Sequence, residues 1–246
     1  MSALAHYLEE EGIASVAVAL IRPQAERTRP PRALWVPFEL GRSFGPPSDK
    51  AFQRRVLLAA LRLLEAQPGA GPVLLADFPD DDPREAPDKA WRPPLVRAAS
   101  GAAEGVALAA EVDAEMRALA AAYARSCSDR GRSTVGLSGL APAAFGGYIA
   151  AWLRGIASND PPASPVADLS PVLCLRFAVD DLKAYALEAA IAGSSHPSSR
   201  QLGDWLWNQT ATGAAIRELR RALLSDADER AKAVAAFLVP ALRVAA

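Results

Sequence analysis

The first forty residues alternate between one amphipathic segment and two apolar runs. Residues 2–11 place Leu4 and Leu8 four apart, which predicts a short helix that ends at Gly12. The runs "IASVAVALI" (13–21) and "ALWVPF" (33–38) are nearly continuous in apolar residues. Such runs are typical of strands that are buried on both faces, as in a parallel sheet.

A second amphipathic segment follows. We expect a helix from about residue 50 to 67, capped by Ser48 or Asp49, and then a third strand over 72–78. Helices that alternate with continuous apolar strands predict an α/β domain over residues 1–78, with a Rossmann-like partial parallel sheet. The apolar positions of the helix fall on one stripe and comprise Phe52, Val56, Leu57, Ala60, Leu61 and Leu64.

The remainder of the chain changes character. Residues 79–100 are rich in proline and acidic side chains, which predicts a linker or an irregular arm. Residues 101–246 read as an all-α helical bundle. The predicted helices cover 103–126, 141–157, 179–192 with aspartates in its first turn, a long one from Ser198 or Ser199 to about 224, and a last one capped by Ser225 and interrupted by Pro240.

Composition narrows the class of protein. The chain has 246 residues, 51% of them hydrophobic, and a net charge of −1, so a substantial core is expected and nucleic acid is not an expected partner. No apolar run approaches the roughly 18 residues that span a membrane, and the N-terminus does not read as a signal peptide. Two cysteines in a chain of this length favour a reducing compartment, so we expect a cytoplasmic protein.

One long stretch resembles a known family. Residues 4–65 read "LAHYLEEEGIASVAVALIRPQAERTRPPRALWVPFELGRSFGPPSDKAFQRRVLLAALRLLE". They contain a helix that ends in E-x-x-G-I, a buried strand, an intervening arm, a second strand that ends in P-x-x-L-G, and a further helix. This order and spacing resembles the C-terminal part of the glycine/sarcosine/betaine (and D-proline) reductase selenoprotein B family.

The resemblance implies a subunit of a reductase that removes the amine from an amino acid derivative. In this family a selenocysteine or cysteine attacks the substrate while a pyruvoyl group on another subunit holds the amine. The family places that nucleophile just before the helix that matches residues 4–11, where this chain has only Met1 and Ser2. We therefore assign no catalytic residue, and expect either a partner reductase subunit that supplies the thiolate or selenolate, or a start upstream of Met1.

The loop after the second predicted strand is the candidate binding site. Strand carboxyl ends gather ligands in α/β folds, and Glu39, Arg42 and Ser43 would supply charge and hydrogen bonds there while Gly41 and Gly45 allow the turns. Glu39 stands where the family commonly has proline, and Arg42 where it has asparagine or histidine. The alternative is that Glu39 and Arg42 are surface charges on a structural turn.

Other candidate chemistry is weak. Residues 131–139 have the glycine spacing of a phosphate loop, but Leu137 occupies the lysine position. Cys127, beside three arginines, is the better candidate redox thiol, although a structural thiol is favoured, and Cys174 reads as a core residue. The histidines His6 and His196 are too far apart for a recognisable zinc site. We expect no metal and no cofactor.

The helical half carries one distinctive segment, "QLGDWLWNQT". Trp205 and Trp207 could line a pocket or a subunit interface, including one between copies of this chain, because tryptophan is enriched at such anchors. An aromatic stripe at helical spacing is more often core. Two functions remain open: a reductase component that depends on a partner subunit, and a non-catalytic binding or scaffold protein.

Overall fold

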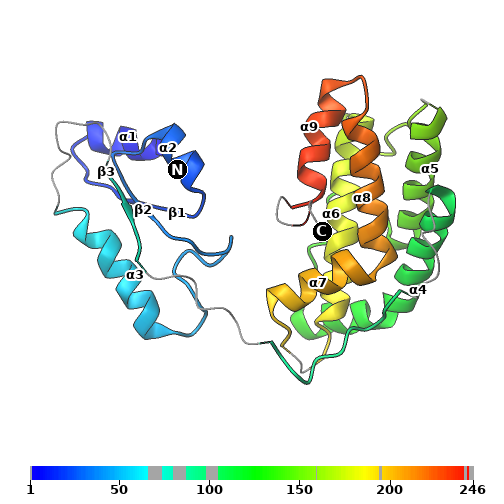
Figure 1. Ribbon diagram of the computed structural model, residues 1–246, viewed down its shortest axis with the longest axis horizontal. Coiled ribbons are helices and arrows are strands. Elements are labelled where there is room, and N and C mark those ends of the chain that lie inside the picture. Colours follow the sequence, from blue (N-terminus) through cyan, green and yellow to red (C-terminus); the bar gives the residue numbers. More distant parts are fainter. Residues whose placement is uncertain are drawn as a thin grey trace. The chain divides into compact units, whose positions relative to one another are not determined.

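The computed structural model describes residues 2–65, 74–79, 87–97, 105–158, 160–193, 196–240 and 243. Contacts divide the chain into two compact units, Met1–Glu85 and Ala86–Ala246, and each is described by itself. Both units are drawn in Figure 1. The division falls inside the predicted linker 79–100. Residues 66–73, 80–86 and 98–104, on which the ends of several predicted elements fall, lie outside the described residues.

The first unit contains a small parallel sheet. Its strands β1 (Ala17–Ala19), β2 (Arg32–Trp35) and β3 (Leu74–Asp77) lie in the order β1-β2-β3, with Ala17 opposite Ala33 and Arg32 opposite Leu74. The predicted parallel pairing is confirmed for these three strands. The strands are shorter than the apolar runs that predicted them, since residues 13–16 and 36–38 are not part of a strand.

Helices cover both faces of the sheet. Helix α3 (Lys50–Arg62) lies on one side, and α1 (Ser2–Glu10) and α2 (Arg22–Thr28) lie on the other (Figure 1). Asp49 caps α3 by accepting a hydrogen bond from the Phe52 amide at 2.9 Å. The core under α3 consists of Leu34, Val36, Phe38, Phe52, Val56, Ala60 and Phe78, and its three phenylalanines contact one another at 5.5 to 5.9 Å between ring centroids.

Two expectations for this unit are wrong. The segment predicted as an intervening arm folds into α2, which begins with Pro23 in its first turn, where the missing amide proton costs nothing. The α3 stripe is also narrower than predicted. Phe52, Val56 and Ala60 are buried, whereas Leu57 and Leu61 are exposed. Three short strands offer too little surface to cover a wide apolar stripe.

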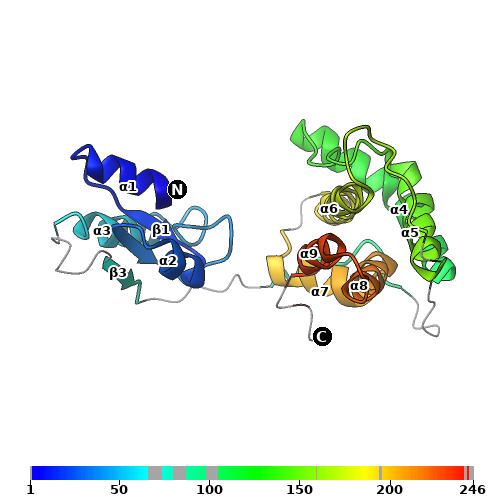
Figure 2. The same ribbon diagram turned by 90° about the horizontal axis from the view of Figure 1, so that it is seen from above.

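Helices are the only regular secondary structure among the described residues of the second unit. Its helices are α4 (Gly105–Arg130), the 3₁₀ turn η1 (Pro142–Ala144), α5 (Phe145–Ser158), α6 (Pro171–Ala190), α7 (Ser199–Gln209), α8 (Ala211–Leu224) and α9 (Glu229–Leu238). Helix α6 is central and lies between α4 and α9 (Figure 2). Across the described residues of both units, no helix is long and apolar enough to cross a membrane.

The start of α6 differs from the prediction. Ser170 caps the helix through the Leu173 amide, and Pro171 occupies its first turn, so α6 begins eight residues before the predicted start at 179. Asp181 is therefore in the middle of the helix and not in its first turn, and it is buried. The apolar run that includes Cys174 hid the helix start, because a short apolar run has no clear period.

The predicted long helix is broken in two. Ser198 begins α7 with a capping box that involves Gln201. Thr210 then adopts an extended conformation, ends α7, and caps α8 through the Gly213 amide at 2.9 Å. The last helix is capped by Asp228, whereas the predicted cap Ser225 ends α8. Threonine competes with the helical backbone for hydrogen bonds, which explains a break without glycine or proline.

Part of the predicted linker belongs to the helical unit. Residues 87–97 pack along it, with the Trp91 indole N–H donating to the Ala190 carbonyl at 3.1 Å and the Arg97 amide donating to the Gln209 carbonyl at 2.8 Å. Leu95 packs against the same core. This stretch is an arm of the second unit, held by backbone hydrogen bonds that proline-rich composition does not reveal.

Candidate functional site

The predicted binding loop forms two consecutive turns after β2. The Arg42 amide donates to the Glu39 carbonyl at 3.0 Å, and the Gly45 amide donates to the Arg42 carbonyl at 2.8 Å. Gly41 and Gly45 have φ values of 94° and 86°, which favour glycine. A Cβ at Gly45 would also lie 2.3 Å from the Phe52 ring. The conformation of the turns therefore explains both glycines.

Leu40 is the most exposed apolar side chain of this loop, and the sequence analysis did not single it out. Leu40 is 75% exposed, more than any other large hydrophobic residue described in the structure. Glu39 is exposed beside it, while Arg42 and Ser43 are half-buried. The signal that could have identified Leu40 is its place between exposed polar residues immediately after a buried strand.

Leu40 lines a groove of about 480 Å³ along β1. The groove also contacts the five consecutive residues 17–21, so it follows the edge of the strand, because successive side chains of a strand point to opposite faces. We call this the edge groove. Its remaining lining residues are Ala3, Gln24, Ala25, Thr28 and Pro30.

The backbone N–H and C=O groups of β1 point alternately toward β2 and toward this groove. The Ala19 carbonyl accepts from the Val36 amide at 2.9 Å, and the Trp35 carbonyl accepts from the Phe78 amide at 2.8 Å. Ala17 and Ala19 therefore direct their polar groups toward β2, and the N–H and C=O of Val18 are directed to the opposite side. Within the described residues, no strand pairs with β1 on that side.

The carboxyl ends of the strands hold an ion-pair network. Arg22, the first residue of α2, donates to both Asp77 carboxylate oxygens at 2.6 Å and to Glu26 at 2.9 Å. Its guanidinium also lies 5.1 Å from the centre of the Trp35 ring. These hydrogen bonds, that to Asp77 foremost, raise the pKa of Arg22. The positive charge of Arg22 at this edge is therefore already paired within the protein.

Both cysteines lie in the second unit. Cys174 is fully buried in the first turn of α6, as its apolar surroundings predicted. Cys127 is half-buried in the last turn of α4, at the helix end whose dipole disfavours a thiolate. Because the sequence contains no third cysteine, the first unit has no thiol.

The glycine-rich segment 131–139 is held by two acids of α6. The Asp181 carboxylate accepts from the amides of Gly136, Leu137 and Ser138 at 2.8 to 2.9 Å, and from the Ser138 hydroxyl at 2.6 Å. Glu188, two turns later, accepts from the amide and hydroxyl of Thr134. The two carboxylates thus fix the conformation of this loop, and the amides that they bind are not available to a phosphate.

The electrostatics of these acids differ from those of Glu115. The hydrogen bonds to Ser138 and its neighbours outweigh burial and lower the pKa of Asp181, and those to Thr134 lower the pKa of Glu188. Glu115, in the middle of α4, accepts from the Ala211 and Thr212 amides at the start of α8. Burial outweighs these contacts and raises the pKa of the Glu115 carboxyl.

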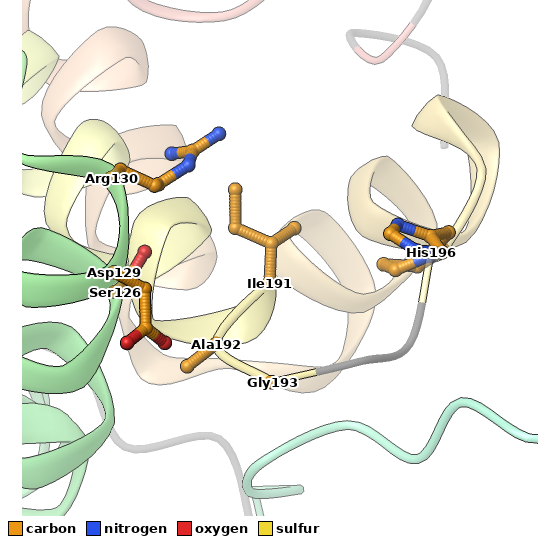
Figure 3. Close-up of a pocket in the computed structure, with 8 residues that line it drawn as sticks. Ser126, Asp129, Arg130, Ile191, Ala192, Gly193 and His196 are labelled. Atoms are coloured by element: carbon orange, nitrogen blue, oxygen red, sulfur yellow. The ribbon is translucent and has the colours of Figure 1, made fainter.

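A polar pocket of about 350 Å³ lies where α4 and α6 end. Figure 3 shows Arg130 and His196 on opposite sides of it, with Ile191 between them. The His196 amide donates to the Asp88 carboxylate at 2.9 Å, which lowers the pKa of Asp88. The charged groups of this pocket do not converge on one point. No group of three metal-ligating side chains occurs anywhere in the described part of the chain.

The two tryptophans are core residues in this unit. Trp205 is fully buried and donates its indole N–H to the Leu95 carbonyl at 2.7 Å, which fastens the arm 87–97 to α7. Trp207 is buried as well, with the Arg217 guanidinium 6.0 Å from its ring centre. Neither side chain lies on the surface of the unit as an anchor for a partner.

Comparisons of the chain with models of protein families, with curated proteins and with solved structures found no match. The resemblance to the selenoprotein B family therefore stays a prediction. The edge groove is the candidate functional site, because it combines exposed apolar side chains with backbone groups that are available for hydrogen bonding.

Proposed function

We propose that the chain is a partner-binding component of a reductase of the glycine/sarcosine/betaine type, and that the edge groove receives an extended segment of the partner. A strand added beside β1 would bond to the N–H and C=O of Val18 and place apolar side chains against Leu40 and Ile21. The observation that carries this proposal is the alignment of the open edge of β1 with the apolar groove.

The absence of a thiol from the first unit supports a dependent role. A reductase of this type needs a thiolate or selenolate nucleophile, and the two cysteines, Cys127 and Cys174, lie in the second unit. The partner would therefore supply the nucleophile and the pyruvoyl group. In this proposal the first unit is a Rossmann-like fragment and the second a helical bundle that supports the assembly.

A scaffold without reductase chemistry is the second candidate. It is favoured by the ion pair of Arg22 and Asp77, which occupies the strand ends where a substrate would bind in an α/β fold. Both candidates need the edge groove, but they differ in what binds there. Mass spectrometry of proteins that co-purify with the tagged chain from its own cells separates them: a pyruvoyl-bearing or selenocysteine-containing subunit supports the reductase, and its absence supports the scaffold.

The groove itself is tested by substitution. We expect Leu40→Asp to abolish capture of the co-purifying partner, because a carboxylate would be desolvated against an apolar segment. Ile13→Asp is the matched control, since Ile13 is also exposed but lies outside the groove. Equal capture by the wild type and Leu40→Asp would exclude the groove as the docking site.

Hydrogen exchange gives a second readout that does not depend on substitution. Strand addition should slow exchange of the Val18 amide by at least about tenfold when the partner is present, because that amide would enter a new ladder. Amides of β2 are already bonded and should change little. Slowed exchange confined to other segments would place the partner elsewhere.

A further inference from the structure

Two exposed stripes on the first unit carry opposite charges. On α3, Lys50, Arg54, Leu57 and Leu61 follow one line along the helix, at i, i+4, i+7 and i+11. Phe44 stands beside them, and a shallow groove of about 520 Å³ lies against Phe44, Arg54 and Leu57. The helix contains four basic residues and no acidic one. Lys50, Arg54, Leu57 and Leu61 together form the basic stripe.

Helix α1 has the complementary arrangement. Leu4 and Tyr7 are 52% and 67% exposed, one turn apart, and Glu10 and Glu11 follow them. Both glutamates are exposed, unlike Glu9, which binds Arg32. Leu4, Tyr7, Glu10 and Glu11 form the acidic stripe. Each stripe therefore joins an apolar half to a charged half.

The charges on both helices oppose their own helix dipoles. Glu10 and Glu11 lie at the carboxyl end of α1, and Lys50 is the first residue of α3. Acids at a helix C-terminus and bases at an N-terminus each interact unfavourably with the dipole of the helix. A contact that brings these opposite charges together offsets both unfavourable interactions.

The spacing of the two stripes matches when the helices are antiparallel. Seven positions separate Leu4 from Glu11, and seven separate Lys50 from Leu57, about 10 Å in each helix. Antiparallel packing puts Glu11 opposite Lys50 and Leu4 opposite Leu57. Tyr7 then faces Arg54, whose guanidinium can stack on the phenol ring.

We infer that a second copy of this chain covers each stripe, with α1 of one copy packed antiparallel on α3 of the next. Helices α1 and α3, which carry the two stripes, lie on opposite sides of the same sheet (Figure 1). The contact is therefore head-to-tail, and each added copy leaves one stripe open unless the assembly closes into a ring. Charge and apolar complementarity within a single unit identify another copy as the occupant.

Sedimentation velocity of the full-length protein tests this inference. The weight-average mass should rise between about 10 µM and about 1 mM, and added salt should reduce the rise, since the charged halves are exposed. The acid-reversed variant carries Glu10→Lys and Glu11→Lys. The base-reversed variant carries Lys50→Glu and Arg54→Glu. Each variant alone should associate at least about tenfold more weakly than the wild type.

An equimolar mixture of the two variants is the decisive sample. Its copies again present opposite charges to one another, so association should return, which general destabilisation of either variant cannot produce. Arg27→Glu, an exposed reversal on α2 outside both stripes, should leave association unchanged. A constant monomer mass for the wild type, or a mixture that stays monomeric, would overturn the inference. Leu40→Asp should not affect it, so this result is independent of docking at the edge groove.

Discussion

The two units differ in how their backbone amides are bonded. In the second unit, buried acids within the helices satisfy the amides of distant segments: Asp181 holds three amides of the loop 131–139, and Glu115 holds two at the start of α8. In the first unit, the Val18 backbone faces an open edge and Leu40 is exposed beside it. Acids that hold loop and helix-start amides indicate a structural role, whereas a strand edge beside an exposed apolar side chain is a surface that a partner strand can join.

The largest effect is expected for Asp181→Ala. The substitution removes the buried acceptor of three loop amides and of the buried Ser138 hydroxyl, and we expect it to destabilise the second unit by about 3–5 kcal/mol. Asp180→Ala is the control, because Asp180 makes only partly exposed ion pairs with Arg176 and Lys183 and should cost less than about 1 kcal/mol. Thermal unfolding and hydrogen exchange of the amides at 136–138 measure both. Similar losses of stability for the two variants would show that the hydrogen bonds of Asp181 to the loop do not stabilise the second unit.

Gly213→Ala should cost about 1–3 kcal/mol in the same unit. A Cβ at this position would lie 2.2 Å from the Leu206 carbonyl oxygen. This atom belongs to the backbone of α7, so it cannot move aside as the end of a flexible side chain could. Gly147→Ala is the matched control: nothing lies within 4 Å of its Cβ, so the substitution should stabilise α5 by up to about 1 kcal/mol. Urea unfolding that ranks the two variants in the reverse order would contradict the close contact between α7 and α8.

Acid should weaken the second unit. Because the folded-state pKa values of Asp181 and Glu188 are lowered, their contribution is present at neutral pH and is lost as the pH falls below the ordinary values of 3.8 and 4.5. Glu115 has the opposite sign: its pKa is raised, so its contribution is lost as the pH rises above 4.5. Melting temperatures across pH 2–7 measure the sum.

Two variants separate these contributions to the pH profile. Asp181→Asn should flatten the acid side of the profile, while Glu115→Gln should flatten the loss above pH 4.5. If the melting temperature of Asp181→Asn falls with acid as steeply as that of the wild type, the loss of stability in acid belongs to other carboxylates. The Arg22 ion pairs of the first unit are about half exposed and should contribute little to either limb. The more buried Glu9, whose pKa is lowered by the Ser15 amide and by Arg32, should add to the acid limb.

The smallest effects are expected on the exposed side chains of the first unit. Leu40→Asp and Leu57→Asp should each change the free energy of unfolding by less than about 0.5 kcal/mol, because neither side chain is part of the core. Circular dichroism during urea unfolding tests this. A large loss of stability for either variant would mean that the side chain packs inside the unit, and its effect on binding could then not be ascribed to a docking surface.

Several features were readable from local sequence. Continuous apolar runs predicted the parallel strands, Asp49 and Ser198 were recognised as caps, and the period of α4 placed Leu108, Val112, Met116 and Leu119 in the core. These features depend on neighbours within a few turns. The candidate site was only partly predictable. The sequence indicated the loop and its charged residues Glu39 and Arg42, but not Leu40.

The sequence by itself determined the order of the units, their secondary-structure classes and the absence of a thiol from the first, since all three follow from local pattern and composition. Only the tertiary structure decided that Asp181 holds a loop more than forty positions away, that residues 87–97 belong to the second unit, and that the open edge of β1 adjoins Leu40. The reason is physical. Local periodicity reports which residues turn inward, whereas hydrogen bonds between distant segments depend on how those segments pack.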